Sequence, residues 1–279
     1  MRVVESGLIA EAVKDACIEA SWNLPSDVRD CIRVAREREP WPAARDTLGR
    51  IIENFGIASR RRSPICQDTG MACVFVEIGN DAHIEGSLED AVNEGVRRGY
   101  TEAYLRKSVV ADPLDRKNTG DNTPAMLYIE FVPGDRITVT VAPKGFGSEN
   151  KSRLKMLRPS DGAEGVTEFV LDTVERAGSD PCPPIVVGVG IGGTFDKAAL
   201  LAKKALLRPL GSRHRQEYYA ELEAALLERI NALGIGPQGF GGAATALAVM
   251  IETLPTHIAG LPCAVNINCH AARHARVAL

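Results

Sequence analysis

The sequence predicts a mixed α/β fold, in which helices alternate with strands and at least one strand pair is antiparallel. Two observations support this class. Apolar residues recur at helical spacing in the first 60 residues, whereas the run from Met71 to Ile78 is typical of a strand. In residues 124–143 the segments AMLYIEFV and ITVTV flank a PGD turn, and their alternating polarity predicts an antiparallel hairpin within an α+β, mixed sheet.

The remaining elements follow from periodicity and from the turn residues that bound them. A polar loop at 62–70 separates the first helices from the strand at 71–78. Later strands are expected at the apolar run IVVGVGIGG and in the segment before the C-terminal Cys/His/Arg cluster. Further helices are expected at 86–108, 162–177, 195–207 and 215–233, and at 243–254 (AATALAVMIETL).

Domain organisation is simple on these grounds. No internal repeat and no break in composition marks a boundary. A chain of 279 residues can bury one large core or two modest ones. We therefore expect a single domain over residues 1–279. Two lobes that meet near the glycine-rich loops would also be consistent with the sequence.

Charge and hydropathy exclude several classes of protein. The formal net charge is −3, so no overall field attracts the chain to nucleic acid or to an anionic membrane. The N-terminal segment is acidic and amphipathic, unlike a signal peptide, and no run of 18 apolar residues occurs. We expect a cytoplasmic protein without nucleic-acid or membrane partners.

Three of the seven cysteines occupy unusual positions. An odd number of cysteines in a reducing compartment does not indicate a disulfide framework. Cys66 lies in the polar turn SPICQDTG, Cys182 is enclosed by prolines in DPCPP, and Cys269 precedes a His/Arg cluster. The others occupy positions that suit a small buried hydrophobe: Cys17, Cys31, Cys73 and Cys263.

The spacing of these three loop cysteines favours iron–sulfur chemistry over zinc. Zinc sites typically use close C-x₂-C pairs, which are absent here. Three soft thiolates suit a four-iron cluster, and a cluster with only three protein ligands leaves one iron open as a Lewis acid. On spacing alone, three unrelated cysteines remain an open alternative.

Four motifs give the chain a family resemblance. PICQDTGMACVFVEIG, KGFGSENKSRLKML, DPCPPIVVGVGIGGTFDKA and THIAGLPCAVNINCHAARH together resemble the class I (iron–sulfur) fumarases and the related L-tartrate dehydratases. The resemblance covers roughly residues 10–275 in the family's order. Such proteins occur as one long chain or as separate α and β subunits, and this chain is similar to the α subunit alone.

The resemblance implies a function. It identifies the α subunit of a [4Fe-4S]-dependent hydro-lyase, with reversible hydration of fumarate to malate as the leading reaction. Dehydration of L-tartrate or of another hydroxy-dicarboxylate is the alternative. A β subunit, which we expect in an α2β2 assembly, would supply essential residues including the base for the carbon-bound proton. The α chain alone should therefore be inactive.

The resemblance also assigns site residues. Cluster ligation falls on Cys66, Cys182 and Cys269. Contacts with a small dicarboxylate substrate fall on five positions, of which Asp68, Arg106 and His257 are the catalytic candidates: Gln67, Asp68, Arg106, Gly147 and His257.

Elementary chemistry is compatible with these roles but also offers structural alternatives. The planar guanidinium of Arg106 could bind a carboxylate bidentately, or lie on the surface. Asp68 could protonate or orient a leaving hydroxyl, or close an Asx-type turn before Thr69. Gln67 could donate to substrate or to cluster sulfur, or be a plain loop residue. His257 could bind a carboxylate or transfer a proton, or be a satisfied core residue.

Several features depart from the family pattern or remain unassigned. Phe146 interrupts the glycine run of the KGFGSEN motif, and Lys151 stands where methionine is expected. Both put the identity of the substrate in doubt. His270 and His274 share a helical i, i+4 spacing, and we expect them to support Cys269 or an interface.

Two other classes of function have some support in the sequence. Gly188, Gly190 and Gly193 match a dinucleotide fingerprint, but a lone match is weak and the following residues predict helix instead of the required strand. We expect these glycines to allow close helix–strand packing or approach to the cluster. A non-catalytic iron–sulfur subunit would need a fourth cysteine ligand, for which Cys73 and Cys263 are the candidates.

Overall fold

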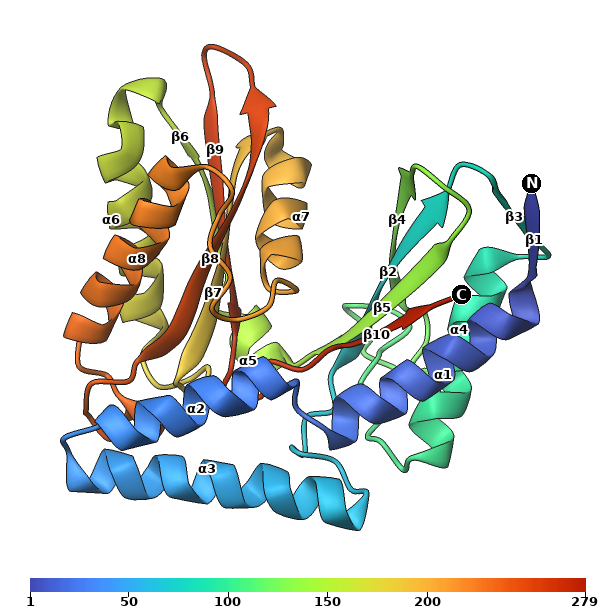
Figure 1. Cartoon of the computed structure of the whole chain (residues 1–279), viewed down its shortest axis with the longest axis horizontal. Helices are drawn as coiled ribbons and strands as arrows, with labels where there is room; N and C mark the ends of the chain where they lie inside the picture. Colours follow the sequence, from blue (N-terminus) through green and yellow to red (C-terminus); the bar gives the residue numbers. More distant parts are fainter. The chain divides into compact units, whose positions relative to one another are not determined.

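The computed structural model describes residues 1–279 and contains helices together with three sheets of parallel and antiparallel strands (Figure 1). The predicted mixed α/β class is confirmed. The chain divides into two compact units, each described by itself. Unit 1 comprises Met1–Pro25, Asn54–Phe146 and Arg273–Leu279, and unit 2 comprises Ser26–Glu53 and Gly147–Ala272. That the whole chain forms one catalytic domain stays a prediction.

Unit 1 is built on a four-stranded sheet with the order β10-β5-β2-β4. Strand β2 pairs in parallel with β4 and antiparallel with β5, and β10 pairs antiparallel with β5. Helices α1 and α4 pack together and against this sheet. The bounds are β1 Arg2–Glu5, α1 Ser6–Trp22, β2 Met71–Gly79, β3 Ala82–Glu85, α4 Leu88–Glu102, β4 Met126–Val132, β5 Ile137–Lys144 and β10 Ala275–Ala278.

Alternation along β5 explains the core of unit 1. Ile137, Val139 and Val141 are fully buried beneath the helices, and the intervening side chains are not. Each such side chain contributes about 1.5–3 kcal/mol when it leaves water. Helix α4 lies close to α1 because Gly95 has no side chain: a Cβ there would lie 2.6 Å from the carbonyl oxygen of Ala10.

The predicted hairpin at 124–143 is wrong in its pairing, although both strands exist. Strands β4 and β5 do not pair with each other, because β2 lies between them. Polarity alternation identifies a strand and its buried face but not its neighbour. Strand β2 is buried at seven of its nine positions, which suits a central strand covered on both sides.

Unit 2 is built on a second four-stranded sheet, with the order β6-β9-β7-β8. Helices α6 and α8 share a core with one face of this sheet, and α7 packs on the other face (Figure 1). The bounds are α2 Ser26–Arg38, α3 Pro42–Arg61, α5 Phe146–Glu149, β6 Arg153–Leu157, α6 Gly162–Ala177, β7 Ile185–Gly193, α7 Phe195–Ala205, α8 Glu217–Ala232, β8 Ala246–Thr256 and β9 Leu261–Asn268, with short 3₁₀ turns at Pro159–Asp161 and Pro237–Gly239. The division between units falls within α3 and α5.

The helix predicted at 243–254 is wrong. This segment forms β8, an edge strand of the unit 2 sheet, which pairs in parallel with β7. Its Ala, Leu and Met residues favour a helix when exposed, but Val249, Met250 and Ile251 are consecutive and buried. Tertiary burial therefore overrides the local preference, as it does for a strand covered on both faces.

The glycines of β7 allow close packing against α7. A Cβ at Gly188 would lie 2.2 Å from the Ala202 carbonyl oxygen, and a Cβ at Gly190 would lie 2.1 Å from that of Ala198. This packing is one of the two uses predicted for these glycines. After α7 the chain forms a loop and then α8, without the adjacent strand that a dinucleotide fold requires.

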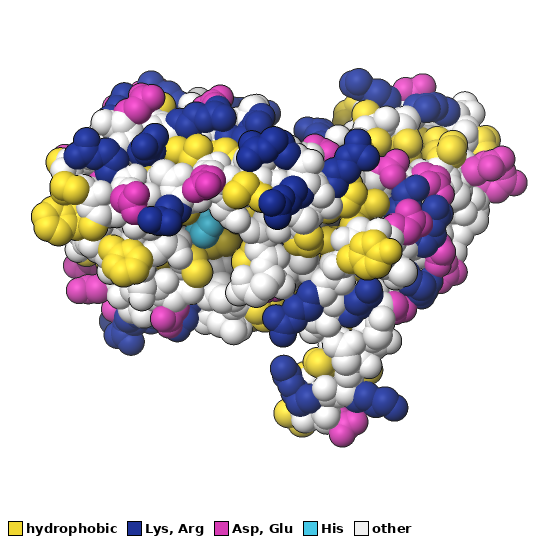
Figure 2. All heavy atoms as spheres, turned by 90° about the horizontal axis from the view of Figure 1, so that it is seen from below, with side chains coloured by type: hydrophobic (Ala, Val, Ile, Leu, Met, Phe, Trp, Pro, Cys, Tyr) yellow, Lys and Arg dark blue, Asp and Glu magenta, His cyan; other side chains and the backbone are white.

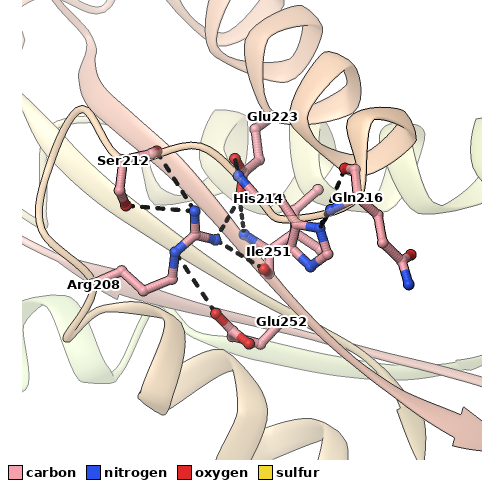
Figure 3. A network of polar contacts seen from close by, with 7 residues as sticks. All are labelled: Arg208, Ser212, His214, Gln216, Glu223, Ile251 and Glu252. Carbon is pink, nitrogen blue, oxygen red and sulfur yellow. Dashed lines mark hydrogen bonds and ion pairs between the residues drawn. The ribbon is translucent and has the colours of Figure 1, made fainter.

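A buried carboxylate fastens the loop between α7 and α8 to the sheet (Figure 3). Glu223 accepts hydrogen bonds from Arg208 Nη1 at 2.6 Å, from the Ile251 N–H at 2.8 Å and from the His214 N–H at 3.1 Å. Arg208 also donates to the Ile251 carbonyl at 3.0 Å. This network connects one side chain of α8 with both the loop and β8.

Basic and acidic side chains both occur across the face seen in Figure 2, so that face does not carry charge of a single sign. None of the helices is both long and apolar enough to cross a membrane.

Replacing Gly190 by Ala should lower the free energy of unfolding by at least about 2 kcal/mol, because the added methyl group overlaps backbone of α7. Gly7→Ala is the matched control: nothing lies within 4 Å of its Cβ position, and we expect no loss or a gain of up to about 1 kcal/mol. Urea unfolding of the full chain measures both. Equal effects of the two substitutions would contradict the packing role of Gly190.

Replacing Glu223 by Ala should destabilise the chain by about 3 kcal/mol, because the mostly buried Arg208 loses its close carboxylate partner and keeps only the longer ion pair with Glu252 at 3.7 Å. Glu223→Gln, which retains an acceptor, should lose less. Glu217→Ala removes an exposed ion pair with Arg213 and should change stability by no more than about 0.5 kcal/mol. Thermal unfolding compares the three variants, and similar losses for Glu223→Ala and Glu217→Ala would rule out this role for the network.

Candidate active site

Cys66 lies in unit 1, in the loop between α3 and β2. The preceding residue, Ile65, is fixed through both of its backbone polar groups. Its N–H donates to the Ser21 carbonyl at 3.0 Å, and its carbonyl accepts from Asn54 Nδ2 at 2.9 Å. Cys66 itself is half-buried, and its thiol donates to Gln67 Oε1 at 3.1 Å. The thiol is therefore held at the surface of unit 1 beside an amide. Rotation of that amide would present N–H groups to a thiolate.

The carboxylate of Asp68 is held by two backbone donors. Its Oδ1 accepts from the Gly70 N–H at 3.0 Å, which is the Asx-type turn considered from the sequence, and its Oδ2 accepts from the Phe146 N–H at 2.9 Å. A Cβ at Gly145 would lie 3.1 Å from Oδ2, so the small residue before Phe146 permits this approach. Each oxygen retains a lone pair for a further donor.

Three consecutive carbonyl groups of this loop accept from buried side chains. Arg273 Nη2 donates to the carbonyl of Asp68. The Tyr100 hydroxyl lies 2.9 Å from the Thr69 carbonyl and 3.1 Å from the Gly70 carbonyl, and Asn122 Nδ2 donates to the latter at 3.2 Å. The three donors come from separate segments, so the loop is fixed by the core of unit 1. We refer to Tyr100, Asn122 and Arg273 as the carbonyl clamp.

Arg106 lies in a loop and not in the helix predicted over 86–108. Helix α4 ends at Glu102, and Tyr104 adopts a left-handed conformation with φ of 53°. The Thr69 hydroxyl donates to the Arg106 carbonyl at 2.9 Å, which brings the backbone of Arg106 to the Cys66 loop. Its side chain is exposed, so the guanidinium is accessible to an anion.

The loop that carries Arg106 is fixed by Asn122. The side-chain oxygen of Asn122 accepts from the Ser108 N–H at 2.6 Å and from the Val109 N–H at 3.3 Å. Because Asn122 also donates to Gly70, one fully buried amide joins the Arg106 loop to the Cys66 loop. The structure therefore brings Gln67, Asp68 and the backbone of Arg106 into one region of unit 1.

In unit 2 the segments of Cys182 and Cys269 lie side by side. The His270 N–H donates to the Cys182 carbonyl at 3.3 Å, and His270 Nδ1 lies 2.9 Å from the same oxygen. Gln238 Nε2 lies 3.2 Å from that nitrogen and donates to the Pro183 carbonyl at 2.9 Å. Cys182 is exposed and has φ of 54°, and Cys269 is half-buried.

The GFGSENKS segment reaches the same end of the unit 2 sheet. Glu149 Oε2 accepts from Asn266 Nδ2 at 2.8 Å, and the hydroxyl of Ser152 accepts from the Ile267 N–H at 3.2 Å. Lys203 donates to Glu149 Oε1 at 2.7 Å. Asn266 lies three residues before Cys269, so these contacts join the segment to the end of β9.

Gly147 and Lys151 lie close to the Cys182 loop. A Cβ on Gly147 would be 3.7 Å from the Asp180 carbonyl oxygen, and Lys151 forms an ion pair with the Asp180 carboxylate. Asp180 is two residues from Cys182. The lysine that departs from the family pattern thus pairs with an acidic residue beside one of the cysteines.

His257 is not brought to these cysteines within unit 2. It lies exposed in the turn between β8 and β9, where its carbonyl accepts from Gly260 N–H at 2.9 Å and its Nδ1 from Ala259 N–H at 3.2 Å. Cys269 follows the opposite end of β9, and a strand of that length spans about 25 Å. His257 is neither a core histidine nor a neighbour of Cys269.

Comparison with known proteins decides the family. A family model described as fumarate hydratase (Fumerase) matches residues 10–278. The chain belongs to this family. A relative from Methanocaldococcus jannaschii, named "Putative L(+)-tartrate dehydratase subunit alpha", is 48% identical over 276 residues, which is 96% of each chain. The L(+)-tartrate dehydratase subunit alpha of Escherichia coli is 35% identical over 269 residues, 95% of this chain and 88% of the relative.

The predicted resemblance is confirmed by these matches. The chain is an α-subunit type of the fumarate hydratase and tartrate dehydratase family, and it belongs to a hydro-lyase enzyme.

The cysteines of this chain differ in how deeply they are buried. Cys17 and Cys263 are fully buried, and burial raises the pKa of each thiol to about 12. Burial, followed by the charges of Asp27 and Asp30, raises the pKa of the Cys31 thiol as well. Cys73 is 4% exposed within β2. Within either unit, no group of three His, Cys, Asp or Glu side chains is close enough to hold a metal ion.

Several residues that support these loops were not identified from the sequence. The carbonyl clamp could not be identified, because Tyr100 and Asn122 act on a loop more than 30 residues away in the chain. The sequence does contain a signal for Glu149, Ser152 and Asn266, because they are polar residues next to a glycine-rich motif or a cysteine motif. Their pairing required the register of β9 against β6.

Asp121 anchors the loop that carries Arg106. Its carboxylate should make the stability of the whole chain depend on pH. Burial raises the pKa of Asp121, but hydrogen bonds from Thr123 and Arg97 outweigh it and lower the pKa from 3.8 to about 2. A depressed folded-state pKa contributes stability above the unfolded pKa, and this stability is lost as the pH falls from about 4 to about 2. Asp121→Asn should therefore be less stable than wild type at pH 6, with the difference shrinking toward pH 2.

Thermal unfolding between pH 6 and pH 2 measures this dependence. Asp46→Asn, which alters an exposed pair with Arg50, is the control and should follow the wild-type curve. A difference for Asp121→Asn that stays constant over this range would show that the carboxylate does not act through its charge.

Proposed function

We propose that this chain is the α subunit of a [4Fe-4S]-dependent hydro-lyase that interconverts a four-carbon hydroxy-dicarboxylate and its dehydrated product. Cys66, Cys182 and Cys269 are the proposed cluster ligands. The observation that carries the proposal is the pairing of the Cys182 and Cys269 segments through His270, at the end of the sheet that the GFGSENKS segment also reaches. Cys66 would complete the set from unit 1.

The donor chemistry of these residues fits such a cluster. The three proposed ligands are exposed or half-buried cysteines in loops, whereas Cys17 and Cys263 are buried thiols whose pKa values of about 12 keep them protonated. Metal-binding thiols must lose their protons, so accessibility favours the loop cysteines. When bound, a cluster with three protein ligands supplies a Lewis-acidic iron for a substrate oxygen.

The residues of the Cys66 loop would act on the substrate hydroxyl. Asp68 is oriented by two backbone N–H groups and has acceptor capacity left, so it can take a hydrogen bond from the hydroxyl or hold its proton. Gln67 lies over the Cys66 thiol and can donate to sulfur or to substrate. The exposed guanidinium of Arg106 would bind one substrate carboxylate bidentately.

Other parts of the site would come from neighbouring chains. A β subunit would supply the base that removes the carbon-bound proton, in an α2β2 assembly. His257 is about a strand's length from Cys269, so in such an assembly it would contact substrate only at a site shared with a neighbouring subunit. Gly147 would allow close approach to the substrate at the Cys182 loop.

Two substrates are favoured by separate observations. The curated relatives at 48% and 35% identity carry the name L(+)-tartrate dehydratase subunit alpha, which favours L(+)-tartrate. The family model carries the name fumarate hydratase, which favours fumarate and malate. The Lys151–Asp180 ion pair lies in the region where the motif departs from the family pattern, and it would act on this choice.

Anaerobic co-expression with the β subunit should yield an iron-loaded complex that turns over L(+)-tartrate or malate, whereas the α chain alone should be inactive. Cys66→Ser, Cys182→Ser and Cys269→Ser should each remove most of the iron and reduce activity at least about a hundredfold, because each removes one proposed ligand. Cys31→Ser is the matched control, since Cys31 lies on α2 outside the proposed site.

Iron and sulfide per α chain and initial rates with L(+)-tartrate, malate and 2-methylmalate measure these effects. No turnover of any of the three by a loaded wild-type complex would reject the hydro-lyase proposal. Full iron content in any of the three loop variants would reject the ligand set.

A further inference from the structure

Arg273 has a buried guanidinium with unpaired donors. The residue is 5% exposed, and its Nη2 donates to the Asp68 carbonyl. Its Nε and Nη1 are also buried, and neither has a hydrogen-bond partner. An arginine side chain stays charged under all ordinary conditions. A buried cation whose N–H donors lack acceptors is energetically unfavourable unless an anion or another acceptor binds to them.

The groups around Arg273 do not supply that anion. No ion pair connects it with a carboxylate of the chain, and the Asp68 side chain already accepts from Gly70 and Phe146. Burial raises the pKa of the Tyr100 hydroxyl well above its usual value. The positive charge of Arg273 opposes this rise, which is consistent with a guanidinium close to the Tyr100 ring. The Tyr100 hydroxyl, however, points to the Thr69 and Gly70 carbonyls.

The position of Arg273 connects it with the proposed cluster ligands. It contacts the carbonyl of Asp68, two residues after Cys66. It also follows Cys269 by four residues, where the chain enters its last stretch of unit 1. The Arg273 guanidinium therefore contacts the loop of Cys66 through a hydrogen bond, and Arg273 lies close to Cys269 in the sequence.

We propose that Arg273 is an anion-binding residue of the hydro-lyase site, whose unpaired Nε–H and Nη1–H groups take an anionic acceptor when the site is filled. This inference rests on the proposed function. The acceptor is either a carboxylate of the substrate or the thiolate-bound cluster, both of which bring negative charge to the Cys66 loop. Charge-assisted hydrogen bonds to either would compensate the buried cation.

A purely structural role makes a different prediction. If Arg273 only held the Asp68 carbonyl, its removal would lower the stability of the empty chain and leave the response to anions unchanged. If it binds an anion, the effect must be larger in the filled protein than in the empty one, since a ligand stabilises the folded state in proportion to its affinity.

The test uses Arg273→Gln and Arg273→Lys in the complex with the β subunit, assembled anaerobically. Arg276→Gln is the matched control: Arg276 lies three residues further on, in β10, and is exposed in an ion pair with Glu77 at 2.7 Å. Three quantities are measured: iron per α chain before substrate is added, kcat and KM for the substrate that wild type turns over, and competition by succinate, a dicarboxylate without a hydroxyl group.

The two sources of the anion give different results. If the substrate carboxylate fills the position, Arg273→Gln keeps its iron, and its succinate affinity falls at least about tenfold, or 1.4 kcal/mol, with KM rising in parallel. If the cluster fills it, Arg273→Gln loses at least half of its iron. In both cases Arg273→Lys is intermediate, because it keeps the charge with fewer donors, and Arg276→Gln matches wild type.

Wild-type iron content together with wild-type succinate affinity in Arg273→Gln would overturn the inference. A lower melting temperature of the empty α chain with an unchanged increase on adding succinate to the loaded complex would also overturn it, in favour of the structural role. Should Arg273→Gln fail to fold by circular dichroism, Arg273→Lys decides by the same measurements. A loaded wild-type complex that turns over no substrate would instead reject the proposed function, and this inference with it.

Discussion

The organisation of the site depends on how the backbone of one loop is satisfied. The carbonyls of Asp68, Thr69 and Gly70 follow the first loop cysteine, and each accepts a hydrogen bond from a buried side chain of the carbonyl clamp. A buried carbonyl left without a donor costs about 1–3 kcal/mol of folding free energy. A shift of this loop would break several of these hydrogen bonds at once. The positions of Cys66 and of the Asp68 carboxylate are consequently set by the core of unit 1.

A similar principle operates in unit 2. The Cys182 loop is held by two interactions of His270 with a single carbonyl, and by Gln238 at the following residue. Glu149 and Ser152 fasten the GFGSENKS segment to the strand that leads to Cys269. Polar side chains that bind backbone therefore hold each cysteine loop.

The sequence predicted elements better than it predicted their partners. Most helices and strands were located because apolar periodicity is a local property, whereas β4 and β5 were assigned to each other although β2 separates them. The local composition of β8 favours a helix, and only burial against β7 and α8 makes this segment a strand. Pairing and burial depend on distant residues, so neither could be obtained from one segment.

The same distinction applies to the site. The loop positions of Cys66, Cys182 and Cys269 were visible in turn and proline residues, and the Asx-type turn of Asp68 was anticipated from Thr69 and Gly70. The supporting residues were not visible, because Tyr100 and Arg273 are far from the loop in sequence. His257 is separated from Cys269 by β9 within unit 2, and its assignment to the site from its motif stays a prediction.

In the proposed function, three thiolates of this chain hold one four-iron cluster with an iron left open to substrate. Mössbauer spectroscopy of the complex loaded with iron-57 can test this arrangement. Adding the substrate should change the isomer shift of a single iron of the cluster and leave the other three as they were. A spectrum in which no iron responds, or in which all four respond alike, would contradict it.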